Sequence, residues 1–384
     1  MAAIRPASAA VPRPVEPGAG RLRLGPGAAY ALIWLGFAGY LCVLVTAPSI
    51  GRRALWAAIA VLVIGFALTP PLLSHDVYSY VDYARLGVVH GLNPYVHAPA
   101  AAPGDSIFSK VAWTGVTSVY GPVFTLATYP LAWLSGGAAV AALKAFAAAS
   151  VLALAALVAR LAPARGVDPL RAAAFVALNP LVLVHLVGGA HNDGLAMLVA
   201  VAGIAALLAA REPAAGAALA GAVAIKLSMA FLAPFALIGA DRRARLLGGA
   251  LAATAVIVLA ADLAFGWHWL DAIDLAGDNQ EHTSHMSVPI TVARLAGLDA
   301  TAVRTAFLAL YAALLGYLLA WTWRGGDWLR AAGWASAGLL LSTSWLLPWY
   351  LIWAIPLAAL SRDRPLQLLV LALTAFQLTA RIPL

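Results

Sequence analysis

Long apolar runs separated by short polar segments make up most of the chain from about residue 28 onward. A helix that crosses a bilayer needs roughly 20 predominantly apolar residues. The runs that reach or approach this length are Ala28–Thr46, Leu55–Thr69, Ala138–Val158, Leu170–Val187, Leu195–Ala210, Leu246–Phe265, Val303–Trp321, Ala331–Ser344, Leu351–Leu360 and Leu366–Thr379. The pattern predicts an all-α polytopic membrane protein with a single transmembrane domain at 28–384.

Three further apolar stretches are too short to cross a membrane comfortably. Pro122–Leu134 is expected to be re-entrant. Ala214–Ile225 and Leu227–Ala240 flank Lys226, and together they suggest a hairpin of half-helices around a buried lysine. Counting these stretches, we expect about 12 or 13 membrane-embedded segments.

Composition supports the membrane assignment, since 63% of residues are hydrophobic, only 10% are charged and the mean hydropathy is +0.89. A soluble domain usually carries about 25% charged residues. The formal net charge of +8 is expected from arginine-rich cytoplasmic loops and does not imply nucleic-acid binding. The single cysteine, Cys42, excludes an intramolecular disulfide and a cysteine-only metal site. Residues 1–27 are rich in Pro and Ala, and we expect a disordered tail without a cleavable signal peptide.

Arginine distribution predicts the orientation of the chain in the membrane, because cytoplasmic loops are enriched in Lys and Arg. The predicted cytoplasmic positions are Arg52 and Arg53, Arg160–Arg171, Arg211, Arg242–Arg245, Arg324–Arg330 and Arg362–Arg364. The remaining loops then share the external face, and they are Pro71–Tyr120, Gly188–Gly194, Gly266–Pro289 and Trp345–Tyr350. These loops carry every histidine except His185. We therefore expect the reactive side chains on the external side of a plasma-membrane protein.

The external loop at 71–121 begins with a pattern of helical spacing. One stripe is apolar and a second is polar and aromatic, and they consist of Val77, Val81, Ala84 and Val88, and of Asp76, Tyr80 and Tyr83. We expect a helix along the membrane interface, ended by Gly91 and Asn93-Pro94. Asp76 stands at its first position, where an aspartate can cap backbone N–H groups. The alternative is a catalytic carboxylate, which requires a partner among the other external loops.

Two further polar groups interrupt apolar surroundings. In "GGAHNDG" (Gly188–Gly194), one of three adjacent polar residues could cap the following helix, but three exceed what one cap requires. Lys226 in "AVAIKLSMAF" could extend toward the interface, but an intramembrane charge is costly and favours a functional role. A cation at this position suits a phosphate.

Two other segments are less specific. In "DNQEHTSH" (Asp278–His285), Glu281, His282 and His285 could ligate a metal, although a solvated loop is the favoured interpretation. In "STSWLLPWYLIW" (Ser342–Trp353), the aromatic residues form either a membrane-boundary belt or a wall for a sugar or an isoprenoid chain. The sequence leaves these alternatives open, and we expect no metal and no organic cofactor.

Five motifs together resemble a known family. They are "HDVYSYVDYARLGVVHGLNPY" (His75–Tyr95), "YGP" (Tyr120–Pro122), "LNPLVLVHLVGGAHNDGLAM" (Leu178–Met197), "AIKLSMAFLAPF" (Ala224–Phe235) and "LLPWYLIW" (Leu346–Trp353). The chain is similar to the polyprenol-phosphate-mannose-dependent α-1,6-mannosyltransferases of actinobacteria, which belong to the type-C glycosyltransferase superfamily. The resemblance implies a type-C glycosyltransferase-like fold, a polyprenyl-phosphate mannose donor and a glycan or glycolipid acceptor of the cell envelope. It also implies an acidic residue in the first external loop that acts as the catalytic base, here Asp76, together with the His-Asn-Asp motif, here His191–Asp193, and the family lysine, here Lys226.

The resulting hypothesis is an inverting transfer in which Asp76 is the general base and the departing lipid phosphate is bound by a set of cations. That set is Lys226, Arg85 and His191. The residues expected to bind substrate are His75, Tyr78, Tyr80, Asn93, Tyr95, Tyr120, Asn192, Asp193, His285, Trp349 and Tyr350. No glycine-rich nucleotide-binding fingerprint occurs, which favours a lipid-linked sugar over a nucleotide sugar.

Other classes of function remain open at the level of the sequence. The nearest competitor is a transferase that uses another polyprenyl-phosphate sugar. A transporter is the main rival class, but transporters tend to have internal repeats, and none is evident. A lipid-binding or scaffold protein would not need a carboxylate, a His-Asn-Asp motif and a buried lysine on one face.

Overall fold

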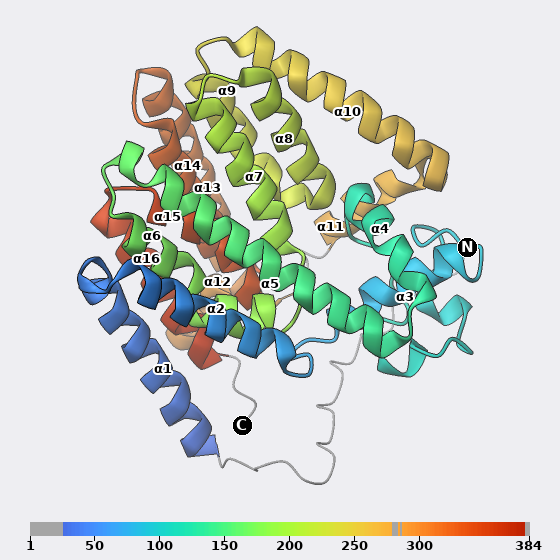
Figure 1. Ribbon diagram of the computed structural model, residues 1–384. Helices are drawn as coiled ribbons and strands as arrows, with labels where there is room; N and C mark the ends of the chain where they lie inside the picture. The colour runs from blue at the N-terminus through green and yellow to red at the C-terminus, as the bar shows by residue number, and fades with distance from the viewer. Residues whose placement is uncertain (1–25, 279–282, 285, 381–384) are drawn as a thin grey trace.

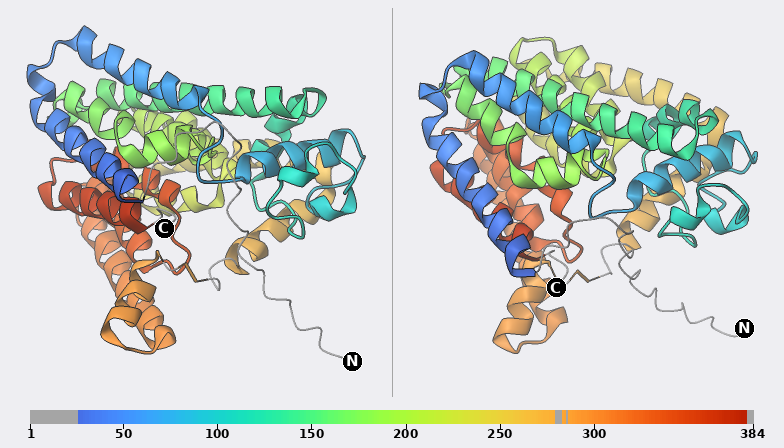
Figure 2. Two further views of the ribbon diagram at one scale, coloured as in Figure 1. Left: turned by 90° about the horizontal axis from the view of Figure 1, so that it is seen from below. Right: turned by 60° about the horizontal axis from the view of Figure 1, so that its bottom comes forward.

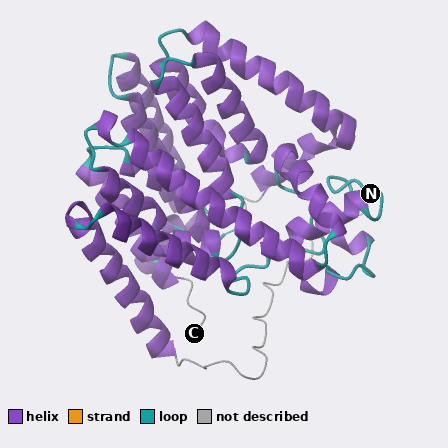
Figure 3. Cartoon of the chain, in the orientation of Figure 1, coloured by secondary structure: helices purple, strands orange, loops and turns teal. Residues whose placement is uncertain are grey.

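The computed structural model describes residues 26–278, 283–284 and 286–380, and every regular element within them is helical (Figure 3). The longer helices are α1 (Pro26–Thr46), α2 (Arg52–Leu68), α3 (Asp76–Val88), α5 (Gly136–Leu161), α7 (Asp193–Leu208), α8 (Glu212–Ile225), α10 (Arg243–Phe265), α13 (Ala300–Trp323), α14 (Trp328–Ser342) and α16 (Arg364–Ala380). The shorter ones are α4 (Pro122–Thr128), α6 (Pro169–Ala177), α9 (Ala233–Gly239), α11 (Asp271–Asp278), α12 (Val288–Ala296) and α15 (Ile355–Ala359). Tight helical turns connect several of them, of which η5 (Pro163–Arg165), η6 (Val182–Val187), η7 (Leu227–Leu232) and η9 (Pro348–Trp353) matter here.

Four helical stretches among the described residues are long and apolar enough to cross a membrane. They are Tyr30–Ser49, Gly136–Leu161, Arg243–Leu275 and Ala300–Trp323. Together with the all-helical architecture, they confirm the prediction of an all-α polytopic membrane protein. The total of about 12 or 13 segments and the type-C glycosyltransferase-like fold stay predictions.

The expected single span Leu170–Val187 is divided in the structure. Helix α6 ends at Ala177, and Asn179-Pro180 separates it from η6, a π-helical turn. Proline lacks the N–H that would continue the helix and disfavours a helical conformation in the residue before it. The side chain of Asn179 accepts a hydrogen bond from Leu181 N and donates one to Thr374 Oγ1, so the break is held from both sides.

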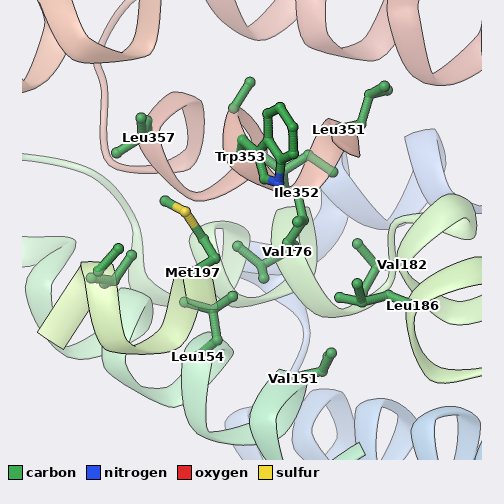
Figure 4. Packing of buried hydrophobic residues seen from close by; sticks show 14 of the residues in the cluster. Val151, Leu154, Val176, Val182, Leu186, Met197, Leu351, Ile352, Trp353 and Leu357 are labelled. Atoms are coloured by element: carbon green, nitrogen blue, oxygen red, sulfur yellow. The ribbon is translucent and has the colours of Figure 1, made fainter. Parts of the chain in front are cut away.

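The buried core lies where α5, α6, α7 and the η9–α15 segment meet (Figure 4). The side chains of Leu154, Val176, Met197 and Leu351 are fully buried. Alanine is frequent on the packed faces of α5, α6 and α14. Small side chains let neighbouring helices approach closely, which is how helices associate within a bilayer.

The first external loop and α4 group together at one end of the bundle, beside the first residues of α5 (Figures 1 and 2). Helix α3 begins at Asp76 and Gly91 has φ +65, as the predicted helix and its end require. The stretch expected to be re-entrant is indeed short, since α4 has 7 residues and the following helical turn Tyr129–Trp133 has 5. The break at Lys226 is also present, because α8 ends at Ile225 and η7 starts at Leu227.

The two predicted sets of loops gather at opposite ends of the helices. Ser284 N donates to Ser344 O, and His191 stacks on Trp349, which joins three of the predicted external loops. At the other end, Arg165 pairs with Asp327, which joins two of the predicted cytoplasmic ones. Which end faces the cytoplasm stays a prediction.

Candidate active site

Asp76 opens α3 without serving as its cap. The capping position is His75, whose side chain makes no capping bond, and no backbone N–H of α3 donates to the Asp76 carboxylate among the described residues. Asp76 N instead donates to Ser74 Oγ at 3.2 Å. The carboxylate is 18% exposed and interacts with the side chain of Trp113. The capping interpretation of Asp76 is therefore not supported by the local geometry.

The His-Asn-Asp motif comes to Asp76 from a distant part of the chain. It follows the π-helical turn η6 and begins directly after Ala190, which has φ +57. Single π-helical turns are frequent at functional sites. His191 Nδ1 lies 3.7 Å from Asp76 Oδ2, and the His191 ring stacks on Trp349 with centroids 3.6 Å apart. This stacking fixes the plane of the imidazole beside the carboxylate.

Asp193 and Lys226 form the centre of the site. Lys226 Nζ donates to Asp193 Oδ2 at 2.7 Å, and Trp353 Nε1 donates to Asp193 Oδ1 at 2.8 Å. Asp193 is fully buried, so its charge is compensated by the lysine and by this second hydrogen bond. Asp193 is the only acceptor for Lys226 Nζ among the described residues, and an ammonium has three donors. Two N–H bonds of Lys226 therefore remain for a ligand.

Aromatic rings enclose the ammonium and the carboxylate. Lys226 Nζ is 5.0 Å from the centroid of Tyr350, and Tyr350 stacks on Trp353 at 4.3 Å. From the α3 side, Tyr80 meets Tyr120 edge-on at 4.7 Å. Burial, followed by the charge of Asp76, raises the pKa of Tyr80 well above 10.0, so this hydroxyl stays protonated. We refer to Asp76, Tyr80, Tyr120, His191, Asn192, Asp193, Lys226, Trp349, Tyr350 and Trp353 as the Asp76–Lys226 cluster.

Asn192 is a second member of this cluster with unused hydrogen-bonding capacity. It is 4% exposed, and neither Oδ1 nor Nδ2 has a hydrogen-bond partner among the described residues. A buried amide without partners costs free energy, so such a group in a native fold requires an explanation. An amide that can donate and accept at once suits the hydroxyl groups of a sugar.

The electrostatics of the cluster favour a basic carboxylate. Burial raises the pKa of Asp76 above 3.8, while Lys226 lowers it and Asp193 raises it. The charge of the ammonium therefore acts on the carboxylate. A carboxylate with a raised pKa that still faces a cation can be ionised at neutral pH and accept a proton.

The turn Tyr120–Pro122 is fixed against the end of α8, next to Lys226. Gly121 N donates to Ile225 O at 3.2 Å, and a side chain at Gly121 would collide with Ala224 O. Only glycine allows this approach, which explains its place in the motif. Tyr95 Oη supports the same turn by donating to Tyr120 O at 2.7 Å.

An apolar cavity of about 470 Å³ begins at this turn. Its walls come from the turn itself, from the residues on either side of Lys226 and from α8, α9, α10 and α11. Representative lining residues are Pro122, Ala224, Leu227, Leu246, Ala250 and Ile273. An elongated apolar group could therefore lie against Ala224 and Leu227, the chain neighbours of the Lys226 region.

Several predicted site residues are not brought into the cluster. Arg85 stands nine positions after Asp76, about 13 Å along the helix, and its Nε donates to both oxygens of Asp105 at 2.9 and 3.0 Å. Asn93 donates to Phe265 O at 2.5 Å, and Tyr95 is buried beneath the Tyr120 turn. These residues shape the loop that carries the site.

His75 and Tyr78 lie on the outer side of α3 and contact Lys110. His75 Nδ1 is 3.2 Å from Lys110 O, and Lys110 Nζ is 5.7 Å from the Tyr78 ring. His285 lies outside the described residues, as do Glu281 and His282. No group of three or more His, Cys, Asp or Glu side chains that could hold a metal occurs within the part of the chain that the structure describes.

Two residues of the site were not predicted as such. Trp353 was assigned only to the aromatic group near Ser342, yet it donates to Asp193. Its spacing of four residues from Trp349 was the available signal. Trp113, which contacts Asp76, lies in an irregular loop without any periodic pattern.

Comparison with known proteins gives a consistent result. The model of the N-terminal domain of the alpha-(1->6)-mannopyranosyltransferase family matches residues 15–242. Alpha-(1->6)-mannopyranosyltransferase A of Mycobacterium tuberculosis is 30% identical over 380 residues, covering 88% of this chain and 72% of the relative. The corresponding protein of Corynebacterium glutamicum is 28% identical over 188 residues, covering 48% of this chain and 37% of the relative. A second alpha-(1->6)-mannopyranosyltransferase of M. tuberculosis is 28% identical, covering 76% of this chain and 63% of its own length. No solved structure matches the chain.

Proposed function

Because the chain belongs to the alpha-(1->6)-mannopyranosyltransferase family, we propose that it transfers mannose from polyprenyl-phosphate mannose to a hydroxyl of a cell-envelope glycan or glycolipid. The transfer forms an α-1,6 linkage with inversion of the anomeric centre. The observation that carries the proposal is the meeting of Asp76 and Lys226 in one cluster, from loops more than 100 residues apart in sequence. One group can accept a proton and the other can bind a phosphate.

In the proposed reaction, the ionised Asp76 accepts the proton of the acceptor hydroxyl. The acceptor oxygen forms a bond to the anomeric carbon from the face opposite the phosphate. The bond between that carbon and the phosphate oxygen breaks, and the electron pair leaves with the polyprenyl phosphate. A β-linked donor therefore gives an α-glycoside. General-base assistance of this kind contributes roughly 10²- to 10⁴-fold.

Lys226 is proposed to stabilise the departing phosphate with its two remaining N–H bonds. Its pairing with Asp193 holds the ammonium in place before substrate binds, so little reorganisation is needed during the reaction. His191, beside Asp76 and stacked on Trp349, is proposed to approach the same phosphate. Arg85 is paired with Asp105, so we do not propose it as a ligand of the phosphate.

The sugar is proposed to bind between Asn192 and the aromatic rings of Tyr80, Tyr120, Trp349 and Tyr350. Asn192 offers a buried donor and acceptor, and the rings offer faces on which a pyranose can stack. The prenyl chain is proposed to follow the apolar cavity beside Lys226. Phosphate and chain would then be bound by adjacent parts of the protein.

The reaction is proposed to take place on the external face of the plasma membrane. The arginine-rich loops lie at the end of the helices away from the cluster, as the positive-inside rule requires for an external site. A lipid-linked donor in the bilayer reaches such a site without a cytosolic nucleotide sugar.

The test is a donor panel with purified protein reconstituted in vesicles. Polyprenyl-phosphate mannose is compared with other polyprenyl-phosphate hexoses and pentoses and with a nucleotide-linked mannose, using a synthetic α-mannoside as acceptor. We expect product only from the mannose lipid, with an α-1,6 linkage by NMR. Efficient transfer of a different sugar would replace the mannose assignment, and release of solute without any glycoside would favour a transporter.

A further inference from the structure

A second cavity, of about 730 Å³, lies at the end of the helices away from the Asp76–Lys226 cluster. Helix α14 separates the two sites: the cavity residue Asp327 directly precedes its first residue, and the aromatic segment of the cluster follows its last residue, Ser342. The 15 residues of α14 span about 22 Å. The cavity is therefore distinct from the candidate active site.

Charged side chains from three separate segments line this cavity. Arginines outnumber carboxylates, with Arg165 from η5, Arg330 from α14, and Arg362 and Arg364 from the segment that leads into α16, against Asp327 and Asp363. Four guanidinium groups face two carboxylates, so two positive charges remain uncompensated. An arginine side chain stays charged at every physiological pH.

The two carboxylates are already engaged by part of this set. Asp327 pairs with Arg165, and Asp363 accepts hydrogen bonds from Arg330 Nε at 2.5 Å and from Trp334 Nε1 at 2.8 Å. Asp363 is 4% exposed and is bonded to the backbone of Leu366 as well. These bonds hold the buried Asp363 carboxylate in place beside the cavity.

The remaining donors have no acceptor among the described residues. Arg362 and Arg364 are exposed and make no hydrogen bond or ion pair with any described residue. Arg165 Nε is buried and also lacks a partner among the described residues. Arg362 lies across Gly166, whose φ of +65 turns the backbone under the guanidinium. A buried N–H without an acceptor beside two exposed arginines suits the oxygens of an anion.

The position of the cavity indicates where the anion comes from. Trp321, in the last turn of the candidate membrane span α13, forms one wall, and the guanidinium of Arg330 is 5.7 Å from its ring. Trp323, two residues on, is 66% exposed. Tryptophan at the end of an exposed apolar helix is typical of the membrane–water boundary. Lipid headgroups are found at this level.

We propose that this cavity binds the phosphate group of an anionic phospholipid headgroup, held by Arg165, Arg362 and Arg364. Guanidinium groups bind phosphate oxygens in pairs, and basic pockets between membrane helices are suited to lipid headgroups. The proposal does not depend on the mannosyltransferase activity.

The test measures lipid retention on the full chain by native mass spectrometry. The protein is reconstituted in phosphatidylcholine nanodiscs with and without phosphatidylglycerol, and then released and analysed. The test variant is Arg362→Gln/Arg364→Gln. The control is Arg52→Gln/Arg53→Gln, which removes the same charge from an exposed pair at the start of α2, also predicted to be cytoplasmic.

We expect the parent and the control to retain phosphatidylglycerol, and the test variant to retain it at least about tenfold less strongly. Equal retention by all three proteins, or equal loss in test and control variants, would overturn the proposal. The parent measured alone gives a second check, since a parent that retains no anionic lipid refutes it without any variant.

A second arm separates the lipid from a phosphate ion in solution. Thermal unfolding is followed in phosphatidylcholine nanodiscs with added inorganic phosphate. We expect no stabilisation of the parent beyond that of the test variant. Stabilisation of the parent alone by inorganic phosphate, without retention of phosphatidylglycerol, would overturn the lipid source.

Discussion

The two ends of α3 use the same kinds of residues in opposite ways. At its start, the Asp76 carboxylate faces His191 and Lys226 and receives no backbone hydrogen bond. Toward its end, Arg85 donates to both oxygens of Asp105, and His90 Nε2 lies 2.6 Å from the same carboxylate. Asp105 receives hydrogen bonds from an arginine and a backbone N–H, whereas the hydrogen bonds to the Asp76 carboxylate come only from the side chains of Trp113 and Ser74 among the described residues. Charged residues on one helix thus divide into a group available for chemistry and a group that holds the loop together.

The pKa directions follow this division. Burial alone would raise the pKa of Asp105, but bonds from Arg85, Ile107 N and His90 outweigh it and lower the value to about 2. At Asp76, burial outweighs Lys226 and the pKa is raised. A carboxylate that remains a better base inside the protein than in water is useful for proton transfer.

The largest effect is expected from Asp76→Asn. Loss of the general base should lower kcat by about 10²- to 10⁴-fold, while the isosteric amide preserves the fold. The measurement is the rate of mannosyl transfer by purified protein. Asp82→Asn is the matched control, because it makes the same chemical change six residues along the same helix. If both variants transfer sugar at the parental rate, Asp76 is not the base.

The pH profile sharpens this result. Because the proton must be absent from Asp76, kcat/KM should fall as pH decreases through its raised pKa, so the acidic limb lies above 3.8. Below that pKa the rate should fall about tenfold per pH unit. The residual activity of Asp76→Asn should lack this limb. An unchanged limb in the variant would assign the titration to another group.

The next effect concerns Lys226. Lys226→Met alone would leave Asp193 buried without its partner, so the informative variant is Lys226→Met with Asp193→Asn. A charged hydrogen bond to phosphate contributes about 1.5–3 kcal/mol, which corresponds to a roughly 10- to 100-fold loss in kcat/KM for the lipid donor. Lys110→Met, in the loop at 71–121 and outside the cluster, is the control. Equal kinetics for both variants would remove Lys226 from phosphate binding.

Sequence patterns single out the residues that meet at the start of α3, but they do not predict the partners of the residues that hold the loop together. Asp76, His191 and Lys226 each stand in apolar surroundings or at the start of a helix, where a polar residue is costly and therefore informative. Arg85, Asn93 and Tyr95 carry similar chemistry, but their partners are set by the path of the loop through Asp105 and by Phe265. No periodic pattern predicts that path.

Helix lengths show the same limit. The apolar run Leu170–Val187 predicted one span, although it contains Asn179-Pro180, which divides it. Hydropathy indicates that a segment is buried, but it does not separate burial in lipid from burial among other helices. Residues Leu351–Leu360 are almost completely buried within the protein and include only the 5-residue helix α15.

The next prediction concerns the ion pair between Arg85 and Asp105, near the end of α3. Arg85→Ala removes the arginine partner of Asp105, whose side chain is 2% exposed, and leaves this buried charge with only His90 and Ile107 N. Such a break costs about 3–5 kcal/mol when complete, and we expect about 2–3 kcal/mol because Arg85 is partly solvated. The measurement is thermal unfolding, together with kcat per folded molecule. A stable variant with strongly reduced kcat would move Arg85 into the catalytic group.

The smallest effect on activity is expected at Asp82. This residue tests whether a second carboxylate on α3 takes part in the reaction, as is proposed for Asp76. Asp82 is 2% exposed and its Oδ2 has no partner among the described residues, yet its neighbours are Arg85, His90 and Asp105. Burial, followed by the charge of Asp105, raises its pKa to about 7. The folded state therefore binds this proton more tightly than the unfolded chain does.

Stability should then fall as pH rises from 3.8, where the unfolded group ionises, to about 7, where the folded group ionises as well. Asp82→Asn removes that loss, so the variant should equal the parent in stability near pH 4 and become more stable than the parent as pH rises toward 8. Thermal unfolding of both proteins across this pH range is the measurement. A pH-independent difference would show that Asp82 does not titrate in this window. Unchanged transfer activity in the same variant would assign Asp82 a structural role in the loop. A carboxylate on α3 would then take part in the reaction only where it lies near Lys226.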